Sequence, residues 1–190
     1  MKIAFFAEGQ AFGKVPRDYN NMRTDMAWIC ASDATRIPYY ETKNIKEKFD
    51  LGVCIIPKRL DLSHKNFALE QSDIPRIKDI CTKVVSMQEG PHWYFQDYPL
   101  EQQIWYYNLL HEMDELLVHN EVDATYFRGL TGKQCKVMRT LLIEDCIKDI
   151  PKNNQGSGVM IGGNFCHWYG GFDSYIVAQE FNEQIHVPSM

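Results

Sequence analysis

The chain has 190 residues, 45% of them hydrophobic and 24% charged, which is typical of a globular protein with a buried core. A formal net charge of −5 at pH 7 argues against a broad nucleic-acid-binding surface, because phosphate binding relies on clustered Lys and Arg. No apolar run is long enough to span a membrane, and the short run that begins at Lys2 lacks the cleavage pattern of a signal peptide.

Strand-like apolar runs alternate with helical patterns along most of the chain. We expect strands at 2–7, 51–57, 83–87, 115–118 and 136–138, and helices at 22–32, 74–82, 100–113, 121–130 and 142–150. Strands that alternate with helices predict a parallel sheet with helices on both faces, so the expected fold class is α/β and Rossmann-like. Ligands of such sheets bind beyond the carboxyl ends of the strands, which makes the residues just after each strand the candidates for function.

A long glycine-containing loop follows the first expected strand. Gly9 and Gly13 lie one residue too close for a P-loop, and Val15 stands where a hydroxyl would bind magnesium. The G-x-G-x-x-G pattern of dinucleotide-binding proteins is also missing. Asp25 is either a second candidate base or a carboxylate that favours the start of the next helix. The candidate substrate-site residues of this loop and helix start are Gly9, Arg17, Arg23 and Asp25.

The segment after the strand at 83–87 carries a carboxylate, an imidazole and several aromatic rings. Aromatic faces with a few polar groups suit the stacking of a sugar or a base, and Trp93 is the candidate for it. Glu89 and His92 are candidates for a general base. Alternatively, the aromatic side chains cover the end of the sheet and His92 is a packed, hydrogen-bonded residue. The polar content of the loop favours a functional role.

His119 and Asn120 follow the strand at 115–118 and are expected to face the same crevice as substrate-binding residues. Asn120 is also a good N-cap for the next helix. Glu121 and Asp123 fall in the first turn of that helix, and we favour a helix-start role for both.

Metal binding is not expected. The His111-Glu112 pair does not begin an H-E-x-x-H motif, because Glu115 stands where the second histidine would be. The six cysteines are dispersed without a C-x-x-C pair, which disfavours a structural zinc site. We expect most of them to be core residues of a cytoplasmic protein.

A segment rich in Pro, Asn, Gly and Ser at 151–158 predicts a domain boundary. We assign 1–152 to the first domain, 153–158 to a linker and 159–190 to the opening β-α element of a second, incomplete domain. The glycine-rich loop of this element can hold a diphosphate through backbone N–H groups and the positive end of the following helix. The phosphate-binding candidates are Gly162, Gly163, Asn164, Tyr169, Gly170 and Gly171. The alternative is a turn with Trp168 and Tyr169 packed beneath it.

These motifs, in this order and each after a strand, resemble glycosyltransferases of the GT-B fold, of bacteriophage type. The residues that carry the resemblance are 22–28, 87–93, 119–121, 161–164 and 168–171. The resemblance implies two Rossmann-like domains that face each other across a cleft. The N-terminal domain would hold the acceptor, and the C-terminal domain would hold the nucleotide sugar. Because most of the donor domain is missing from the chain, we expect a C-terminal half to be needed for catalysis.

The resemblance further implies sugar transfer to an acceptor hydroxyl without a metal or other cofactor. Glu89 is then the first candidate for the base, followed by Asp25 and His92. Phage members of this kind add sugars to modified DNA bases. DNA is therefore an implied acceptor and the host cytoplasm the implied compartment.

Two other functions compete with this hypothesis. One is a non-catalytic module that keeps the sugar-transferase fold and recognises a glycan or a partner protein through its aromatic loop. The other is a nucleotide-dependent epimerase or dehydrogenase, which the absence of G-x-G-x-x-G disfavours.

Overall fold

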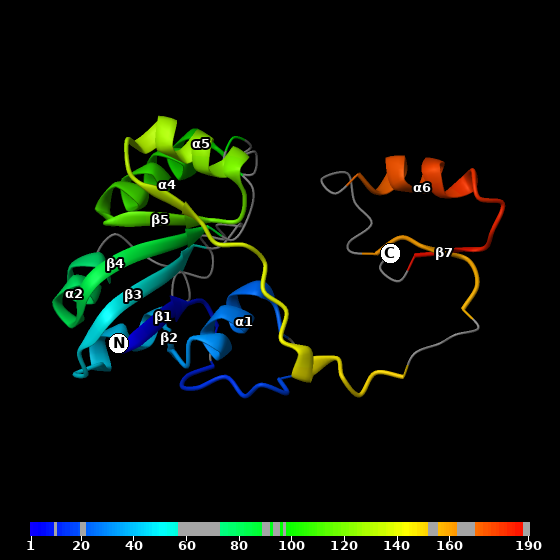
Figure 1. Cartoon of the computed structure of the whole chain (residues 1–190). Coiled ribbons are helices and arrows are strands. Elements are labelled where there is room, and N and C mark those ends of the chain that lie inside the picture. The colour runs from blue at the N-terminus through cyan, green and yellow to red at the C-terminus, as the bar shows by residue number, and fades with distance from the viewer. Residues whose placement is uncertain are drawn as a thin grey trace. The chain divides into compact units, whose positions relative to one another are not determined.

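The chain folds into two compact units, Met1–Asp149 and Ile150–Met190 (Figure 1). The computed structural model describes residues 1–9, 11–19, 22–56, 73–88, 92, 96, 98–151, 156–162 and 170–187. Within these residues, every helix is too short or too polar to cross a lipid bilayer.

The first unit is built on a parallel sheet of six strands in the order β2-β1-β3-β4-β5-β6. The strands are β1 (Ile3–Ala7), β2 (Thr35–Pro38), β3 (Phe49–Ile56), β4 (Cys81–Gln88), β5 (Glu115–Val118) and β6 (Cys135–Val137). The expected α/β class with a Rossmann-like parallel sheet is thereby confirmed, although the sequence did not predict β2. The chain order reverses between β1 and β3, and ligands of open parallel sheets bind at such a reversal.

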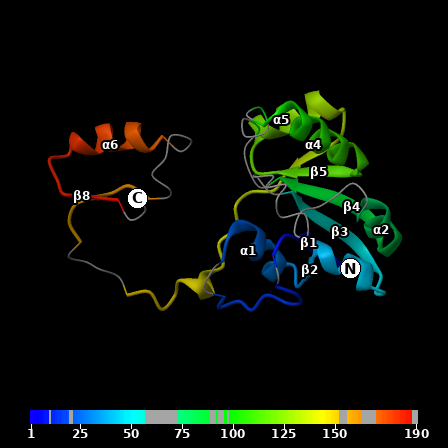
Figure 2. The ribbon, with the colours of Figure 1, turned by 180° about the vertical axis from the view of Figure 1, so that it is seen from behind.

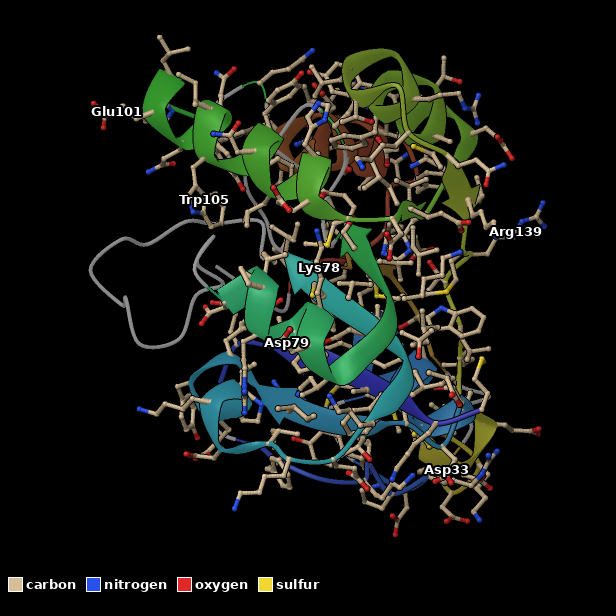
Figure 3. The ribbon with its side chains drawn as sticks, turned by 90° about the vertical axis from the view of Figure 1, so that its left-hand side faces the viewer. Asp33, Lys78, Asp79, Glu101, Trp105 and Arg139 are labelled. Carbon is tan, nitrogen blue, oxygen red and sulfur yellow. The ribbon has the colours of Figure 1, made fainter. Side chains whose placement is uncertain are left out.

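Helices lie on both faces of this sheet (Figure 1, Figure 2). They are α1 (Thr24–Ala31), α2 (Asp73–Ile80), α4 (Leu100–Glu112) and α5 (Glu121–Thr131), with the 3-10 helices η1 (Tyr39–Asn44) and η3 (Glu144–Cys146). The side chains of α1 pack on one face, whereas α2, α4 and α5 pack on the other. Figure 3 looks onto the second face, with Lys78 on α2 and Trp105 on α4 in front of the sheet.

Strand β1 illustrates why the sheet is covered on both faces. Successive side chains of a strand point to opposite faces. Ala4 and Phe6 accordingly join the core under α2, α4 and α5, while Phe5 and Ala7 join the core under α1. A strand buried on both faces reads as an unbroken apolar run, which is how its sequence predicted it.

The prediction of a helix at 142–150 is wrong. Only the short helix η3 forms there. The carboxylate of Asp145, at the centre of η3, lies 2.5 Å from Nε of Arg17. This long-range ion pair connects the segment to the loop after β1. Such a contact cannot be read from the local periodicity that predicted the helix.

Over its described residues, the second unit is a β-α-β element. Strands β7 (Val159–Met160) and β8 (Ile185–His186) pair in parallel, and α6 (Gly171–Gln179) connects them. Several large apolar side chains of this unit are exposed: Met160, Phe172, Ile176, Val177 and Phe181.

Candidate functional site

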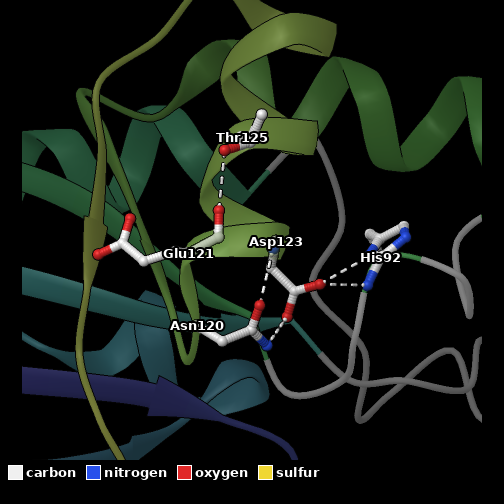
Figure 4. Close-up of polar contacts among 5 residues, drawn as sticks. All are labelled: His92, Asn120, Glu121, Asp123 and Thr125. Atoms are coloured by element: carbon white, nitrogen blue, oxygen red, sulfur yellow. Dashed lines mark hydrogen bonds and ion pairs between the residues drawn. The ribbon is translucent and has the colours of Figure 1, made fainter.

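A hydrogen-bonded histidine and aspartate lie at the carboxyl ends of β4 and β5 (Figure 4). Nδ1 of His92 is 2.8 Å from Oδ1 of Asp123, and the backbone N–H of His92 donates to the same oxygen at 2.8 Å. The Asp123 side chain is 4% exposed and the imidazole 24% exposed. Because a carboxylate oxygen accepts, Nδ1 carries the proton in this pair. In the neutral tautomer that this hydrogen bond selects, the lone pair is on Nε2.

Asn120 completes the support of this pair. Its Oδ1 accepts the backbone N–H of Asp123 at 2.8 Å, so Asn120 is the N-cap of α5, as expected. Its Nδ2 donates to Oδ2 of Asp123 at 2.7 Å. Both carboxylate oxygens of Asp123 are therefore occupied, one by His92 and one by Asn120, which fixes the orientation of the carboxylate.

Tyr126 packs against the imidazole from the next turn of α5, with ring centroids 4.8 Å apart. Ring packing on one side and the carboxylate on another hold His92 in place while part of its surface stays open. The general-base chemistry expected for His92 therefore has a supporting geometry: an oriented imidazole with a fixed tautomer.

The sequence did not predict the partner of His92. The sequence indicates only a helix-start role for Asp123 and gives no sign of Tyr126. A signal existed, because the first turn of the helix after β5 must lie beside the segment after β4 if these strands are neighbours. Glu89 and Trp93, two other candidates of this segment, lie outside the described residues.

A second polar group surrounds the start of α1. Asp25 lies in the first turn, and its side chain is 8% exposed. One of its oxygens is 3.0 Å from Nη2 of Arg23. Gly9 lies next to another arginine, since a Cβ placed on it would be 3.5 Å from Nη2 of Arg36 on β2. The sequence singled out Gly9, Arg23 and Asp25 but not Arg36.

Arg17 and His119 make other contacts. Arg17 binds Asp145, and this hydrogen bond raises the pKa of the guanidinium and lowers the pKa of the carboxyl. His119 donates from Nδ1 to the carbonyl oxygen of Met138 at 2.9 Å, next to the end of β6. Among the described residues, no hydrogen bond joins either side chain to the His92 and Asp123 pair.

The phosphate-binding candidates belong to the second unit. Gly162, Gly170 and Gly171 are described there, whereas Gly163, Asn164 and Tyr169 lie outside the described residues. Gly170 is the N-cap of α6 with φ of 65°. A cavity of about 480 Å³ lies between β7 and α6. Asp173 and Ser174 are the polar side chains that line it, and the other lining residues are apolar or glycine.

No cluster of three or more metal-ligating side chains occurs within the described part of the chain. The fold and the site define an α/β protein with an oriented histidine at the carboxyl edge of a parallel sheet. Comparisons with protein-family models, curated proteins and solved structures give no match to this chain.

Proposed function

We propose that the protein is a glycosyltransferase of the GT-B type, in which the first unit holds the acceptor and His92 removes the proton from the acceptor hydroxyl. The observation that carries the choice of base is the 2.8 Å hydrogen bond between Nδ1 of His92 and the buried carboxylate of Asp123. The order of the motifs along the sequence supports the class of reaction.

In this reaction, Nε2 of His92 takes the hydroxyl proton as the acceptor oxygen forms a bond to the anomeric carbon of the donor sugar. The bond between that carbon and the diphosphate oxygen breaks, and the diphosphate leaves with the electron pair. Asp123 stabilises the imidazolium that forms and keeps the ring oriented, so it is a positioning residue.

His92 is a better-supported base than Asp25. The Asp25 carboxylate is buried and already engaged by Arg23, so one of its oxygens is occupied. Glu89 stays a prediction from the sequence.

The second unit supports the donor side of the proposal. Gly162 and the N-terminus of α6 provide backbone N–H groups of the kind that bind a diphosphate. The exposed apolar side chains of α6 fit burial against further β-α elements of a donor-binding domain. A nucleotide sugar is the proposed donor, and no cofactor is needed. DNA with a modified base, in the cytoplasm of a host cell, is the acceptor that the resemblance implies.

The test uses the full chain supplied with a C-terminal donor half, which the resemblance implies is needed for catalysis, and UDP-glucose or GDP-mannose as donor. The acceptors are DNA with a hydroxymethylated base and, as an uncharged probe, methyl glucoside. Release of UDP or GDP measures transfer, and the thermal shift caused by each donor measures binding. His92→Gln should lower turnover by about 10²- to 10⁴-fold, the typical contribution of a general base. The matched control is His111→Gln, which changes an exposed histidine on α4 and should leave turnover unchanged.

A donor-induced thermal shift without turnover in the unchanged protein would favour the non-catalytic glycan-binding module. Equal turnover in His92→Gln and the unchanged protein would remove His92 as the base. If no donor shifts the unfolding temperature and none is consumed, the glycosyltransferase proposal is wrong.

A further inference from the structure

Strand β2 contains a buried arginine that holds the loop after β1. Arg36 is 6% exposed. Its Nη1 donates to the carbonyl oxygen of Ala11, and its Nη2 donates to the carbonyl oxygen of Glu8. Its backbone forms an isolated antiparallel bridge with Gly13, with N to O distances of 2.9 and 2.8 Å in the two directions. One residue thus fixes the loop at three positions.

The glycines of the loop match this arrangement. Gly9 has φ of 85° and Gly13 has φ of 103°, a region that residues with a Cβ rarely adopt. The backbone at Gly9 runs next to the guanidinium, since a Cβ there would touch Nη2 at 3.5 Å. The path of the loop and the position of the arginine therefore depend on each other.

The location of Arg36 is suited to a functional role. It faces the loop after β1, beside the point where the strand order reverses and where parallel sheets bind ligands. A buried guanidinium needs compensation for lost hydration. Burial lowers the pKa of Arg36, while the nearby Asp25 carboxylate raises it. The two carbonyl oxygens supply further compensation, and within the described residues Nε is left without a hydrogen-bond partner.

We propose that Arg36 is a positioning residue that preforms the loop after β1 as one wall of the acceptor site. It acts through the carbonyl groups of Glu8 and Ala11, and it does not touch the acceptor. The functional part of this inference rests on the proposed glycosyltransferase activity. The conformational part, that the arginine side chain orders the loop, does not.

The experiment compares Arg36→Met and Arg36→Lys with the unchanged full chain. Methionine keeps much of the length but has no donor. Lysine keeps the charge but lacks the planar fork that reaches two carbonyl groups at once. Arg76→Met is the matched control, because Arg76 is an exposed arginine of α2 that donates to the carbonyl oxygen of Ile45 at 3.2 Å. Amide hydrogen exchange at Gly13 and the carbonyl ¹³C shifts of Glu8 and Ala11 report on the loop. Exchange in β4 reports on the rest of the sheet.

In Arg36→Met, exchange at Gly13 should become about tenfold faster, the effect of roughly one net hydrogen bond, with exchange in β4 unchanged. The two carbonyl shifts should move together. Arg36→Lys should lie between Arg36→Met and the unchanged chain in all three readouts. If Arg36→Met does not fold, Arg36→Lys decides alone, because a lysine cannot keep both carbonyl shifts at their original values. Unchanged exchange at Gly13, or an equal acceleration in β4, would overturn the inference.

The same variants separate this inference from the proposed function. In the transfer assay, turnover in Arg36→Met should fall about tenfold while the thermal shift caused by the donor stays the same, with partial rescue in Arg36→Lys. A loosened loop with unchanged turnover would overturn the functional part. If the unchanged protein transfers no sugar, the proposed function fails, and the exchange measurement still decides whether Arg36 orders the loop.

Discussion

A single carboxylate oxygen at the start of α5 binds His92, in the segment after β4, through two hydrogen bonds. Oδ1 of Asp123 accepts both the backbone N–H and the Nδ1–H of His92, each at 2.8 Å, although the residues are 31 positions apart. They meet because β4 and β5 are neighbouring parallel strands whose carboxyl ends share one edge of the sheet. The same oxygen therefore orients the imidazole and anchors the chain that carries it. A change at Asp123 should affect the stability of the fold as well as the histidine.

Removal of the Asp123 carboxylate should destabilise the first unit. In Asp123→Ala, three donors lose their acceptor: two on His92 and the Nδ2 group of Asn120. We expect the free energy of unfolding to fall by about 1–3 kcal/mol, measured by urea denaturation. Glu121→Ala is the matched control, because this carboxylate lies in the same helical turn, is exposed and points away from His92 (Figure 4). It should change stability by less than about 0.5 kcal/mol. Equal losses in the two variants would contradict the assigned role of Asp123.

The elements with strong local patterns could be predicted from the sequence, and the others could not. The unbroken apolar runs of β1 and β3 and the cap at Asn120 are local signals, and the structure has all three. Strand β2 has only four residues, with a charge at Arg36 and a proline at its end, so it resembles a loop. Its place in the sheet comes from pairing with β1, which is a long-range contact.

The partners within the site were beyond sequence reasoning for a related reason. The sequence shows which residues follow each strand, but not which strands lie next to each other. His92 was identified as a candidate because it follows a strand, whereas the role of Asp123 depends on the adjacency of β4 and β5. The role of Arg36 depends in the same way on the adjacency of β1 and β2. A residue that acts on a neighbouring strand's loop has no signature of its own.

Glu115 should make a pH-dependent contribution to stability. Its side chain, 16% exposed, lies 2.6 Å from Nζ of Lys83 and 2.9 Å from Nζ of Lys136. The hydrogen bonds from Lys83 and then Lys136 lower the pKa of the Glu115 carboxyl. A carboxyl whose pKa is lower in the folded than in the unfolded protein stabilises the fold at pH values above its unfolded pKa of about 4.3. This stabilisation is lost as the pH falls through the pKa of the folded protein.

Glu115→Gln should therefore lower the free energy of unfolding at neutral pH by about 0.5–1 kcal/mol, a modest figure because both ammonium groups are partly solvated. The difference from the unchanged protein should narrow as the pH falls below about 4.3. It should also narrow in about 1 M NaCl, where the screening length is about 3 Å. Urea denaturation over a pH series measures both effects. A difference that stays constant or widens in acid would contradict the prediction.

Gly52 allows the close approach of β3 to the start of β4. A Cβ at this position would lie 2.7 Å from Sγ of Cys81 and 3.1 Å from a ring carbon of Phe6. We expect Gly52→Ala to destabilise the fold by about 1–3 kcal/mol through overpacking. Cys81→Ala removes the nearest atom, so the double variant should be more stable than the sum of the single changes implies, by at least about 0.5 kcal/mol. Cys135→Ala, a buried cysteine on β6, should show no such coupling. Equal coupling with both cysteines would argue against the proposed clash.

Two glycines near the end of α5 should respond in opposite directions to the same substitution. Gly129 lies within the helix, and no atom is within 4 Å of a Cβ placed there, so Gly129→Ala should raise the free energy of unfolding by about 0.5–1 kcal/mol through helix propensity. Gly132 is the C-cap with φ of 69°, and its N–H donates to the carbonyl oxygen of Arg128 at 2.9 Å. Gly132→Ala should cost about 1–2 kcal/mol, because a Cβ strains the left-handed conformation. Gly132→Asn should cost less, since asparagine tolerates this region. Thermal and urea denaturation of the three variants measure these changes, and a stabilising Gly132→Ala would contradict the left-handed cap.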